Sequence, residues 1–337
     1  MRHTESIIGN SAALANALEQ VSHLAQINRP ILILGERGTG KELAAQRLHF
    51  LSPRWEAPLV KVNCAAMAET LLESELFGHE PGAFTGATRT HYGRFERADG
   101  GTLFLDELGT MSVRLQEKLL RLVEYGEFER VGGQHTLSVD VRIVGATNVD
   151  LRLLAERGAF RHDLLDRLSF DVVHLPALRH RAEDIQELAQ HFAVQMCGEL
   201  GWEMFAGFST AAQKTLAQHQ WPGNVRELKN TVERSLFRWN SRDTAVEEIV
   251  INPFQSPWEE PAAAPAKGPG DTVEPKTAPP PVSFSKQMDT IEKDLVQRAL
   301  SEQGNNQRLT ASALGLSYDQ LRGLVRKHGL SSRKRRQ

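Results

Sequence analysis

Four short apolar runs in the first half of the chain predict the strands of a parallel sheet. Each run is almost continuously apolar, as in strands that are covered by helices on both faces. The runs are Ile31–Leu34, Leu59–Val62, Gly100–Leu105 (which opens with a glycine turn) and Val141–Ala146. We therefore expect an α/β domain in which a parallel sheet is flanked by helices.

From about Arg179 to Asn240 a helical pattern replaces the strand pattern. Apolar residues recur every three to four positions, which predicts the buried stripe of a helix. They are Ile185, Leu188, Ala189, Phe192 and Met196. The segment Trp221–Gly223 interrupts the pattern, and Asn224 is expected to cap the next helix. This part of the chain predicts a small helical subdomain.

The last quarter of the chain begins with a change of composition, because the stretch from Ser256 to Pro281 is rich in Pro, Ala and Lys/Glu. Such a stretch buries too little apolar surface to fold by itself, so we expect a linker. The predicted boundaries are 1–175 for the α/β subdomain, 176–254 for the helical lid, 255–284 for the linker, 285–330 for a C-terminal domain and 331–337 for a basic tail.

Three helices are predicted in the C-terminal domain. The apolar positions of the first are Met288, Ile291, Leu295, Val296 and Ala299. A short helix follows from about residue 307 to residue 314. After a turn at Gly315, a capping box at Ser317 and Gln320 opens the third helix. Leu321, Leu324 and Val325 are expected to face inward, which makes this a helix-turn-helix layout.

The polar side chains of this domain are candidate DNA contacts. They are Arg308, Ser317, Tyr318, Asp319, Gln320, Arg322, Arg326 and Lys327. A three-helix bundle that serves only dimerisation is the alternative. The basic run Arg333–Arg336 is expected to add affinity for phosphates without reading bases.

The charge distribution supports a nucleic-acid partner at this end. The 337 residues carry 40 Lys and Arg against 42 Asp and Glu, a net charge of −2. From Ser285 onward 11 basic and 5 acidic residues give +6, so the remainder carries −2 − 6 = −8. A basic module on an acidic body indicates nucleic acid, with a solvated basic tail as the alternative.

Targeting and redox signals point to the cytoplasm. The two cysteines, Cys64 and Cys197, are far apart and lack metal-site spacing, so reduced thiols are expected. No apolar run approaches the ~20 residues of a membrane span. The N-terminus is not followed by a signal-type apolar stretch.

A glycine-rich loop between the first apolar run and a helical pattern predicts a phosphate site. Its residues are Gly35, Glu36, Arg37, Gly38, Thr39, Gly40 and Lys41. Backbone N–H groups and the helix N-terminus favour phosphates there, and Lys41 is expected beside the β- and γ-phosphates. Glu42 stands where the general pattern has the Ser or Thr that holds magnesium, so carboxylates elsewhere must contribute more.

Polar residues end three of the predicted strands. Asp106 is a candidate magnesium ligand, and Glu107 is a candidate base for the attacking water. Thr147 and Asn148 follow another strand, and Asn63 ends a third; such positions face the ligand crevice of parallel sheets. Plain turn residues are the alternative for Asn63, Thr147 and Asn148.

Two arginines in a Leu-rich stretch, Arg161 and Arg167, admit two interpretations. They are either surface ion-pair partners or arginine fingers that reach the γ-phosphate on a neighbouring subunit.

An unusual loop lies between the phosphate loop and the acidic pair. It reads GAFTGA and consists of Gly82, Ala83, Phe84, Thr85, Gly86 and Ala87. It is either an ordinary surface loop whose Phe84 packs into the core, or a mobile tip that offers a ring and a hydroxyl to a partner. Its place as an insertion in a nucleotide-binding domain favours the mobile tip.

In their order, these motifs resemble the AAA+ domain of bacterial enhancer-binding proteins, the activators of sigma-54 RNA polymerase. The resemblance covers about residues 6–253 and includes Phe160–Arg167 and Trp221–Leu228. It implies an α/β AAA+ ATPase with a helical lid, followed by an all-α, Fis-type helix-turn-helix domain. It also implies a ring, usually a hexamer, with ATP and Mg²⁺ between subunits; a dimer off DNA is compatible with it.

The resemblance implies roles for single residues. Lys41 would hold phosphates, Asp106 would serve Mg²⁺, Glu107 would activate water, and Asn63 would pair with Glu107 as a nucleotide switch. The glutamate at position 42 is also usual in the family.

Further roles concern partners. The resemblance implies that Arg161 and Arg167 act in trans and that Arg226 contacts the nucleotide of its own chain. The GAFTGA loop would contact the sigma factor. With no sensory domain ahead of the ATPase, we expect a separate inhibitory protein, and Trp55 is the candidate contact.

Two other functional classes remain open from the sequence. One is another AAA+ remodeller, such as a helicase, a helicase loader or an unfoldase, which strand separation without polymerase would indicate. The other is a DNA-binding protein that uses ATP only to assemble, which DNA binding without turnover would indicate.

Overall fold

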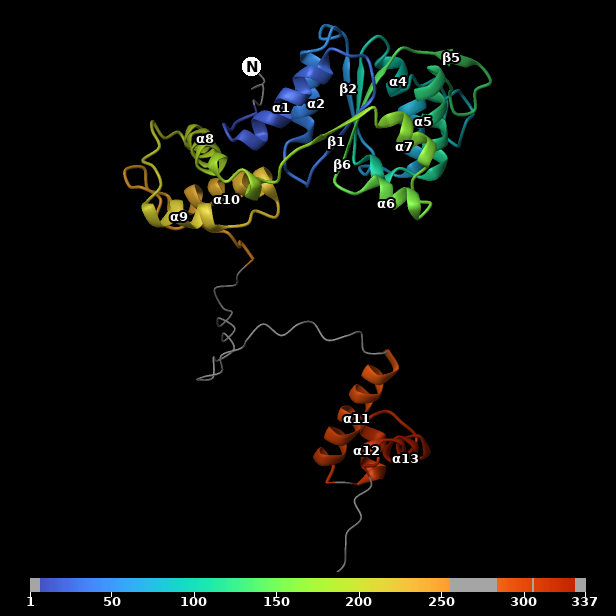
Figure 1. Cartoon of the computed structure of the whole chain (residues 1–337), viewed down its shortest axis with the longest axis vertical. Coiled ribbons are helices and arrows are strands. Elements are labelled where there is room, and N and C mark those ends of the chain that lie inside the picture. Colours follow the sequence, from blue (N-terminus) through green and yellow to red (C-terminus); the bar gives the residue numbers. More distant parts are fainter. Residues whose placement is uncertain (1–6, 255–283, 305, 331–337) are drawn as a thin grey trace, which may run out of the picture. The chain divides into compact units, whose positions relative to one another are not determined.

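A five-stranded parallel sheet forms the centre of the first part of the molecule (Figure 1). The computed structural model describes residues 7–254, 284–304 and 306–330. They fall into two compact units, Met1–Ser256 and Pro257–Gln337. Apart from residue 284, the predicted linker lies outside the described residues, as does the predicted basic tail.

The strand order in the sheet is β2-β3-β6-β1-β7. The strands are β1 (Ile31–Leu34), β2 (Leu59–Asn63), β3 (Thr102–Asp106), β6 (Arg142–Thr147) and β7 (Asp171–His174). All neighbours are parallel, so the carboxyl ends of the strands share one edge. The register pairs Asn63 with Asp106 and Leu34 with Thr147. The four predicted strands are confirmed, whereas β7 was not predicted.

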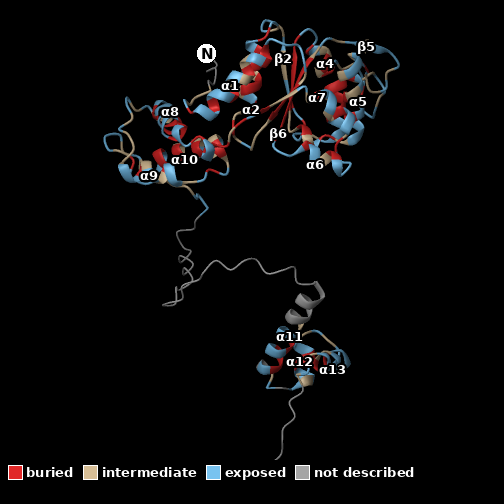
Figure 2. Cartoon of the chain, in the orientation of Figure 1, coloured by how far each residue is buried: buried red, intermediate tan, exposed pale blue. Residues whose placement is uncertain are grey.

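Successive side chains of the strands point to opposite faces of the sheet, and each face is covered by its own hydrophobic core. On one face, Ile31 and Ile33 pack with residues of α1 (Ala12–Ala25) and α2 (Lys41–Phe50). On the other face, Leu32 packs in a core that includes Phe77 and Phe95. The helices of that face are α3 (Glu69–Phe77), α4 (Arg94–Arg97), α5 (Val113–Tyr125), α6 (Leu151–Glu156) and α7 (His162–Leu168). Figure 2 shows the buried strands between these layers.

A short antiparallel hairpin projects beside the second layer. It consists of β4 (Glu127–Glu129) and β5 (Thr136–Ser138). Two 3-10 turns complete the first unit's connections, η1 (Leu108–Thr110) and η2 (Leu178–His180).

The helical lid follows the sheet in the same unit. It contains α8 (Glu183–Glu199), α9 (Thr210–Gln218) and α10 (Asn224–Trp239). Their shared core holds Ile185, Leu188, Ala189 and Phe192, with Met196 partly buried against it. The predicted helical stripe is confirmed. The buried indole of Trp221 anchors this core and donates to the carbonyl oxygen of Leu216 at 2.9 Å.

The second unit is a three-helix domain. Its helices are α11 (Phe284–Glu302), α12 (Gln307–Ala313) and α13 (Tyr318–Lys327). Val296, Leu321 and Val325 form its core, against which Leu324 packs. Leu295 is exposed, contrary to the predicted stripe, and Met288 and Ile291 lie outside the described side chains.

Candidate functional site

The phosphate loop lies at the carboxyl edge of the sheet, between β1 and α2. Gly38 and Gly40 adopt left-handed φ values of 77° and 102°, which glycine reaches without steric cost. These turns let consecutive N–H groups converge, and α2 begins at Lys41 directly after them. The loop therefore has the geometry of an anion-binding helix start.

Lys41 is a buried cation inside this loop. Its ε-ammonium donates to the carbonyl oxygens of Gly35 at 3.0 Å and Glu36 at 3.2 Å. Burial lowers its pKa, while the charges of Asp106 and Glu107 act in the opposite direction. The ammonium is thus held next to the two carboxylates that the sequence predicted for the same site.

Asp106 and Glu107 stand at the end of β3 with different surroundings. Burial raises the pKa of Asp106, although its Oδ1 accepts the backbone N–H of Glu107 at 2.9 Å. Glu107 has a left-handed φ of 52°, a conformation uncommon for a residue with a side chain. This turn directs its carboxylate toward the phosphate loop, where Oε1 lies 3.4 Å from Nε of Arg37.

The donor set here fits a hard divalent cation that also binds phosphates. Within the described residues, no three His, Cys, Asp or Glu side chains are arranged to enclose a metal by themselves. Mg²⁺ does not need such a cage, because it usually takes one or two carboxylates together with substrate phosphates and waters. Asp106 beside the phosphate loop meets that requirement.

Glu42 is engaged elsewhere. Its Oε1 lies 2.7 Å from Nζ of Lys61 on β2, and the pair is solvent-exposed. An exposed ion pair of this kind contributes little to stability, so the contact with Lys61 does not hold Glu42 firmly in place.

Three further polar residues lie at the carboxyl edge. Asn63 is opposite Asp106, but its Oδ1 accepts the N–H of Ala65 at 2.9 Å rather than contacting Glu107. Thr147 is fully buried and accepts the N–H of Val149 at 3.2 Å. Its carbonyl oxygen accepts the N–H of Gly35 at 3.3 Å. Asn148 is exposed.

The lid contacts the phosphate loop directly. The N–H of Val225 donates to the carbonyl oxygen of Gly38 at 3.0 Å. A Cβ added to Gly38 would come within 2.3 Å of the carbonyl oxygen of Gly223 and 3.1 Å of Cβ of Arg226. Gly38 therefore permits this close approach, and Arg226 emerges next to the loop.

The prediction that Asn224 caps α10 is wrong. Gly223 occupies the cap position, and Asn224 has a left-handed φ of 53°. Its fully buried side chain instead links three segments, since Oδ1 accepts the N–H of Leu178 at 2.7 Å and Nδ2 donates to Glu36 and to the carbonyl oxygen of Arg37. Tertiary contacts replace the local capping bond.

The two candidate arginine fingers are in ion pairs of their own chain. Arg161 precedes α7 and contacts Asp163 at 2.7 Å. Arg167 lies near the end of α7 and contacts Glu124 at 2.7 Å. Both pairs are at least partly exposed, so either arginine can exchange its partner at small cost.

The GAFTGA loop is an exposed turn between α3 and α4. Gly82 and Gly86 adopt left-handed φ values of 82° and 99°, and the N–H of Gly82 donates to the carbonyl oxygen of Ala87 at 2.8 Å. Phe84 is 45% exposed, so the interpretation that it packs into the core is wrong. Thr85 is exposed beside it.

Two contacts seat this loop. The ring of Phe84 meets the ring of His79 edge-on, with centroids 4.8 Å apart, and His79 stacks on His91 at 5.3 Å. Ala83 also packs closely on Gly132. A Cβ added to Gly132 would lie 2.8 Å from the Cβ of Ala83. The loop therefore rests on the segment between β4 and β5.

Arg130 in that segment anchors the base of the loop. It contacts Glu80 at 2.5 Å and Glu96 at 2.6 Å, and its guanidinium lies 4.9 Å from the ring centroid of Tyr92. Sequence reasoning missed this residue because its partners are 34 and 50 positions away.

The candidate DNA contacts lie on the surface of the second unit. The reciprocal bonds of the capping box are present, with Ser317 Oγ accepting from the N–H of Gln320 and the Gln320 side chain accepting from the N–H of Ser317. The exposed candidates are Arg308, Ser317, Tyr318, Asp319, Gln320, Arg322, Arg326 and Lys327. Lys327 lies 2.7 Å from Glu292.

Trp55 is exposed as expected, at 57%. It follows Arg54, whose guanidinium pairs with Asp140 at 2.7 Å and so orders the turn. In the part of the chain that the structure describes, no helix is long and apolar enough to cross a membrane.

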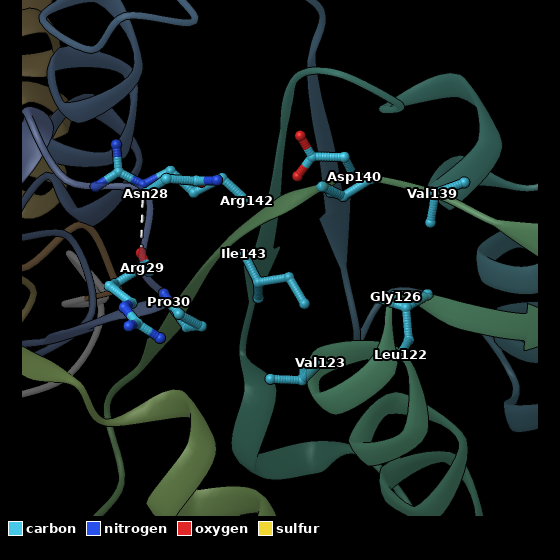
Figure 3. A pocket seen from close by; sticks show the side chains of 11 residues that line it. Asn28, Arg29, Pro30, Leu122, Val123, Gly126, Val139, Asp140, Arg142 and Ile143 are labelled. Atoms are coloured by element: carbon cyan, nitrogen blue, oxygen red, sulfur yellow. Dashed lines mark hydrogen bonds between the residues drawn. The ribbon is translucent and has the colours of Figure 1, made fainter.

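A separate cavity of about 200 Å³ lies at the amino ends of β1 and β6, the opposite edge from the phosphate loop (Figure 3). Arg142 enters it and donates to the backbone carbonyl oxygens of Arg29 at 3.3 Å, Ala25 at 3.0 Å and Leu24 at 2.7 Å. Burial lowers the pKa of Arg142 to about 10. Its donors are used inside the fold, which makes the cavity a poor anion site.

Comparison with known proteins agrees with the motifs. The Sigma-54 interaction domain family matches residues 7–174, and the AAA+ ATPase lid domain family matches residues 179–252. The chain is 52% identical over 328 residues to the Psp operon transcriptional activator of Escherichia coli (strain K12), covering 97% of this chain and 98% of that relative.

Two further similarities have different extents. The chain is 48% identical over 248 residues to the Nif-specific regulatory protein of Azotobacter vinelandii, covering 73% of this chain but 46% of that relative. The crystal structure of NtrX from Brucella abortus in complex with ATP superposes with a TM-score of 0.67 at 31% identity, covering 96% of this chain and 70% of that one. The chain belongs to the AAA+ family of sigma-54-dependent transcriptional activators.

Proposed function

We propose that this activator hydrolyses ATP to ADP and phosphate and uses the energy to convert the closed complex of sigma-54 RNA polymerase into the open complex. The observation that carries this proposal is the convergence of Lys41, Asp106 and Glu107 at one sheet edge, in a subdomain that also exposes the GAFTGA loop. The site supplies a motor, and the loop supplies a surface for its output.

Hydrolysis requires a base beside the terminal phosphate. Glu107 accepts a proton from water while the water oxygen forms a bond to the γ-phosphorus and the bond to the β-γ bridging oxygen breaks. Lys41 and the N–H groups of the phosphate loop hold the charge that develops on the phosphate oxygens. The proton on Glu107 returns to solvent with the products.

Asp106 is the residue that would hold Mg²⁺. The positive charge of the metal would offset the negative charge of the phosphates. The contact between Asp106 and the N–H of Glu107 fixes the spacing of the two carboxylates. Asp106 therefore orients the base as well as serving the metal.

Assembly into a hexameric ring completes the site. Arg161 and Arg167 would leave Asp163 and Glu124 to reach the γ-phosphate on the neighbouring subunit, where a guanidinium stabilises transition-state charge. Arg226 would contact the nucleotide of its own chain, which its position beside Gly38 supports.

The GAFTGA loop would deliver the output. Phe84 and Thr85 are its exposed ring and hydroxyl, and they would contact sigma-54. Asn63 would exchange Ala65 for Glu107 when the nucleotide state changes, which would carry the signal from the site toward the loop.

The second unit would bind enhancer DNA through α13. Its exposed basic side chains suit the phosphates and edges of a major groove. Likeness to the Psp operon activator supports a role at an operon of that kind. An inhibitory protein would dock at Trp55, whose ring is exposed.

The proposal is tested by in vitro transcription from a sigma-54 promoter with its upstream enhancer. ATP should support open complexes and transcripts, whereas a nonhydrolysable ATP analogue should support neither. Equal activity with both nucleotides would contradict energy coupling. Strand separation by the purified chain without polymerase would instead indicate an AAA+ helicase.

A further inference from the structure

The phosphate loop is bonded to the lid through four consecutive residues. The side chain of Glu36 and the carbonyl oxygens of Arg37, Gly38 and Thr39 all have lid partners. The lid uses acceptor atoms of the loop, a carboxylate and three carbonyl oxygens, whereas a phosphate would bind the backbone N–H groups. The nucleotide and the lid therefore do not compete for the same atoms.

Two of these contacts involve arginines of the segment that leads into the lid. Arg179 donates to both carboxylate oxygens of Glu36, at 2.9 and 2.5 Å. Arg181 is buried and donates to the carbonyl oxygen of Thr39 at 3.1 Å, while its Nε has no partner among the described residues. Substitution of Arg181 would therefore disturb a buried site. Arg179 is partly exposed, so it can be substituted with less disturbance of the fold.

The Glu36 carboxylate is strongly committed to the lid. It accepts from Asn224 Nδ2 at 3.1 Å in addition to Arg179, and the hydrogen bonds from Arg179 and then Asn224 are the main causes that lower its pKa to about 2. Glu36 is therefore a carboxylate near neutral pH. Its partners come from two lid segments, η2 and the start of α10.

We propose that Glu36 and Arg179 form a positioning pair that couples the phosphate loop to the lid, so that nucleotide binding at the loop orders the lid. Neither residue supplies the base or the metal ligand; the pair acts by holding the loop against the lid segments that carry Arg179 and Asn224. This inference rests on the proposed ATP site at the loop.

The test compares Arg179→Met and Glu36→Gln with Lys229→Met. Lys229 pairs with Glu233 within α10, so its variant removes an exposed lid cation that has no contact with the loop. Binding of the fluorescent nucleotide mant-ADP and the KM and kcat for ATP are measured on the full chain. Thermal unfolding verifies that each variant is folded.

We expect Arg179→Met and Glu36→Gln to weaken mant-ADP binding and to raise the KM about fivefold, the scale of one exposed ion pair, with kcat within about twofold. Arg179→Lys should recover part of the loss, and Lys229→Met should match the unmodified chain. If both variants at the pair bind mant-ADP as well as Lys229→Met does, the inference is wrong.

Hydrogen exchange separates coupling from simple packing. In the unmodified chain, mant-ADP should slow exchange in the phosphate loop and also in residues 176–184 and 221–228. In Arg179→Met at saturating nucleotide, the slowing should remain in the loop and be reduced in the lid segments, where the hydrogen bonds of Arg181, Asn224 and Val225 to the loop are still present. Identical protection in both proteins would overturn the coupling, while an unmodified chain that binds no mant-ADP would overturn the ATP site itself.

Discussion

Arg37 Nε lies 3.4 Å from Oε1 of Glu107, so the phosphate loop and the candidate base are in direct electrostatic contact. Arg37 is 68% exposed and Glu107 is 14% exposed at their side chains. The arginine can therefore swing into solvent, whereas the carboxylate stays in the site. A nucleotide that draws Arg37 away would leave Glu107 available to a water molecule.

Glu107→Gln should separate binding from hydrolysis. The amide keeps the shape of the side chain but cannot take a proton from water, so the turnover rate should fall by about 10²-fold or more. The nucleotide affinity should stay within about threefold of the original, because Lys41 and the loop are intact. Phosphate release and mant-ATP binding measure the two quantities. The exposed lid residue Glu203, changed to Gln, is the control and should leave both unchanged; hydrolysis at the normal rate by Glu107→Gln would exclude it as the base.

Thr85→Ala should uncouple the motor from its output. Thr85 is exposed in the GAFTGA loop and is not among the residues assigned to the nucleotide site, so ATP turnover should stay within about threefold. Open-complex formation on a sigma-54 promoter, followed by permanganate footprinting, should be lost. Thr88 is exposed three residues further along the chain, and Thr88→Ala should retain open-complex formation. Normal open complexes with Thr85→Ala would rule out the hydroxyl as the contact.

Cys64 should make stability sensitive to alkaline pH. Burial first, and then the charges of Asp106 and Glu107, raise the pKa of its thiol from 9.0 to about 12. The folded chain therefore keeps a proton that the unfolded chain loses, so this contribution is complete below pH 9 and is lost as the pH rises toward 12. The loss is up to about 1.4 kcal/mol per pH unit.

Urea unfolding at pH 7.5 and pH 10 tests this expectation. The difference in unfolding free energy between the two pH values should be smaller for Cys64→Ala than for the unmodified chain, because the other titrating groups are common to both. An equal difference would show that the thiol does not titrate in this range.

Two neighbours on α13 should differ in how they affect DNA binding. Leu321 is fully buried in the core of the second unit, so Leu321→Ala should destabilise that unit by about 2–5 kcal/mol. Arg322 is exposed, so Arg322→Ala should weaken enhancer binding with no loss of folding. Circular dichroism melts and gel-shift titrations measure the two effects. ATP turnover should be unchanged in both, and an Arg322→Ala chain with full DNA affinity would remove that residue from the interface.

The parts of the fold that were predicted correctly are those with a local signal in the sequence. The strand β1 and the phosphate loop were found because a continuous apolar run and a glycine turn are local signals. The strand β7 was missed because only Val172 and Val173 are apolar in it and the first residue is Asp171. The buried stripe of α8 was predicted from the spacing of its apolar residues. Leu295 was wrongly assigned to the buried stripe of α11, because spacing alone does not show whether another element packs over a given apolar residue.

The sequence by itself determined which residues are chemically suited to the site: Lys41 after a glycine loop, Asp106 and Glu107 after an apolar strand, and a glycine-rich loop around Phe84 that resists helix and strand. The exposure of Phe84 was decided by the structure. Only the tertiary structure decided the partners of these residues. Glu36 contacts Arg179, which is 143 positions away in the sequence, and Asn224, which is 188 positions away. The side chain of Asn224 makes this contact and does not cap α10. Periodicity and turn chemistry act over a few residues, whereas such contacts depend on how the lid packs against the sheet, which no local pattern encodes.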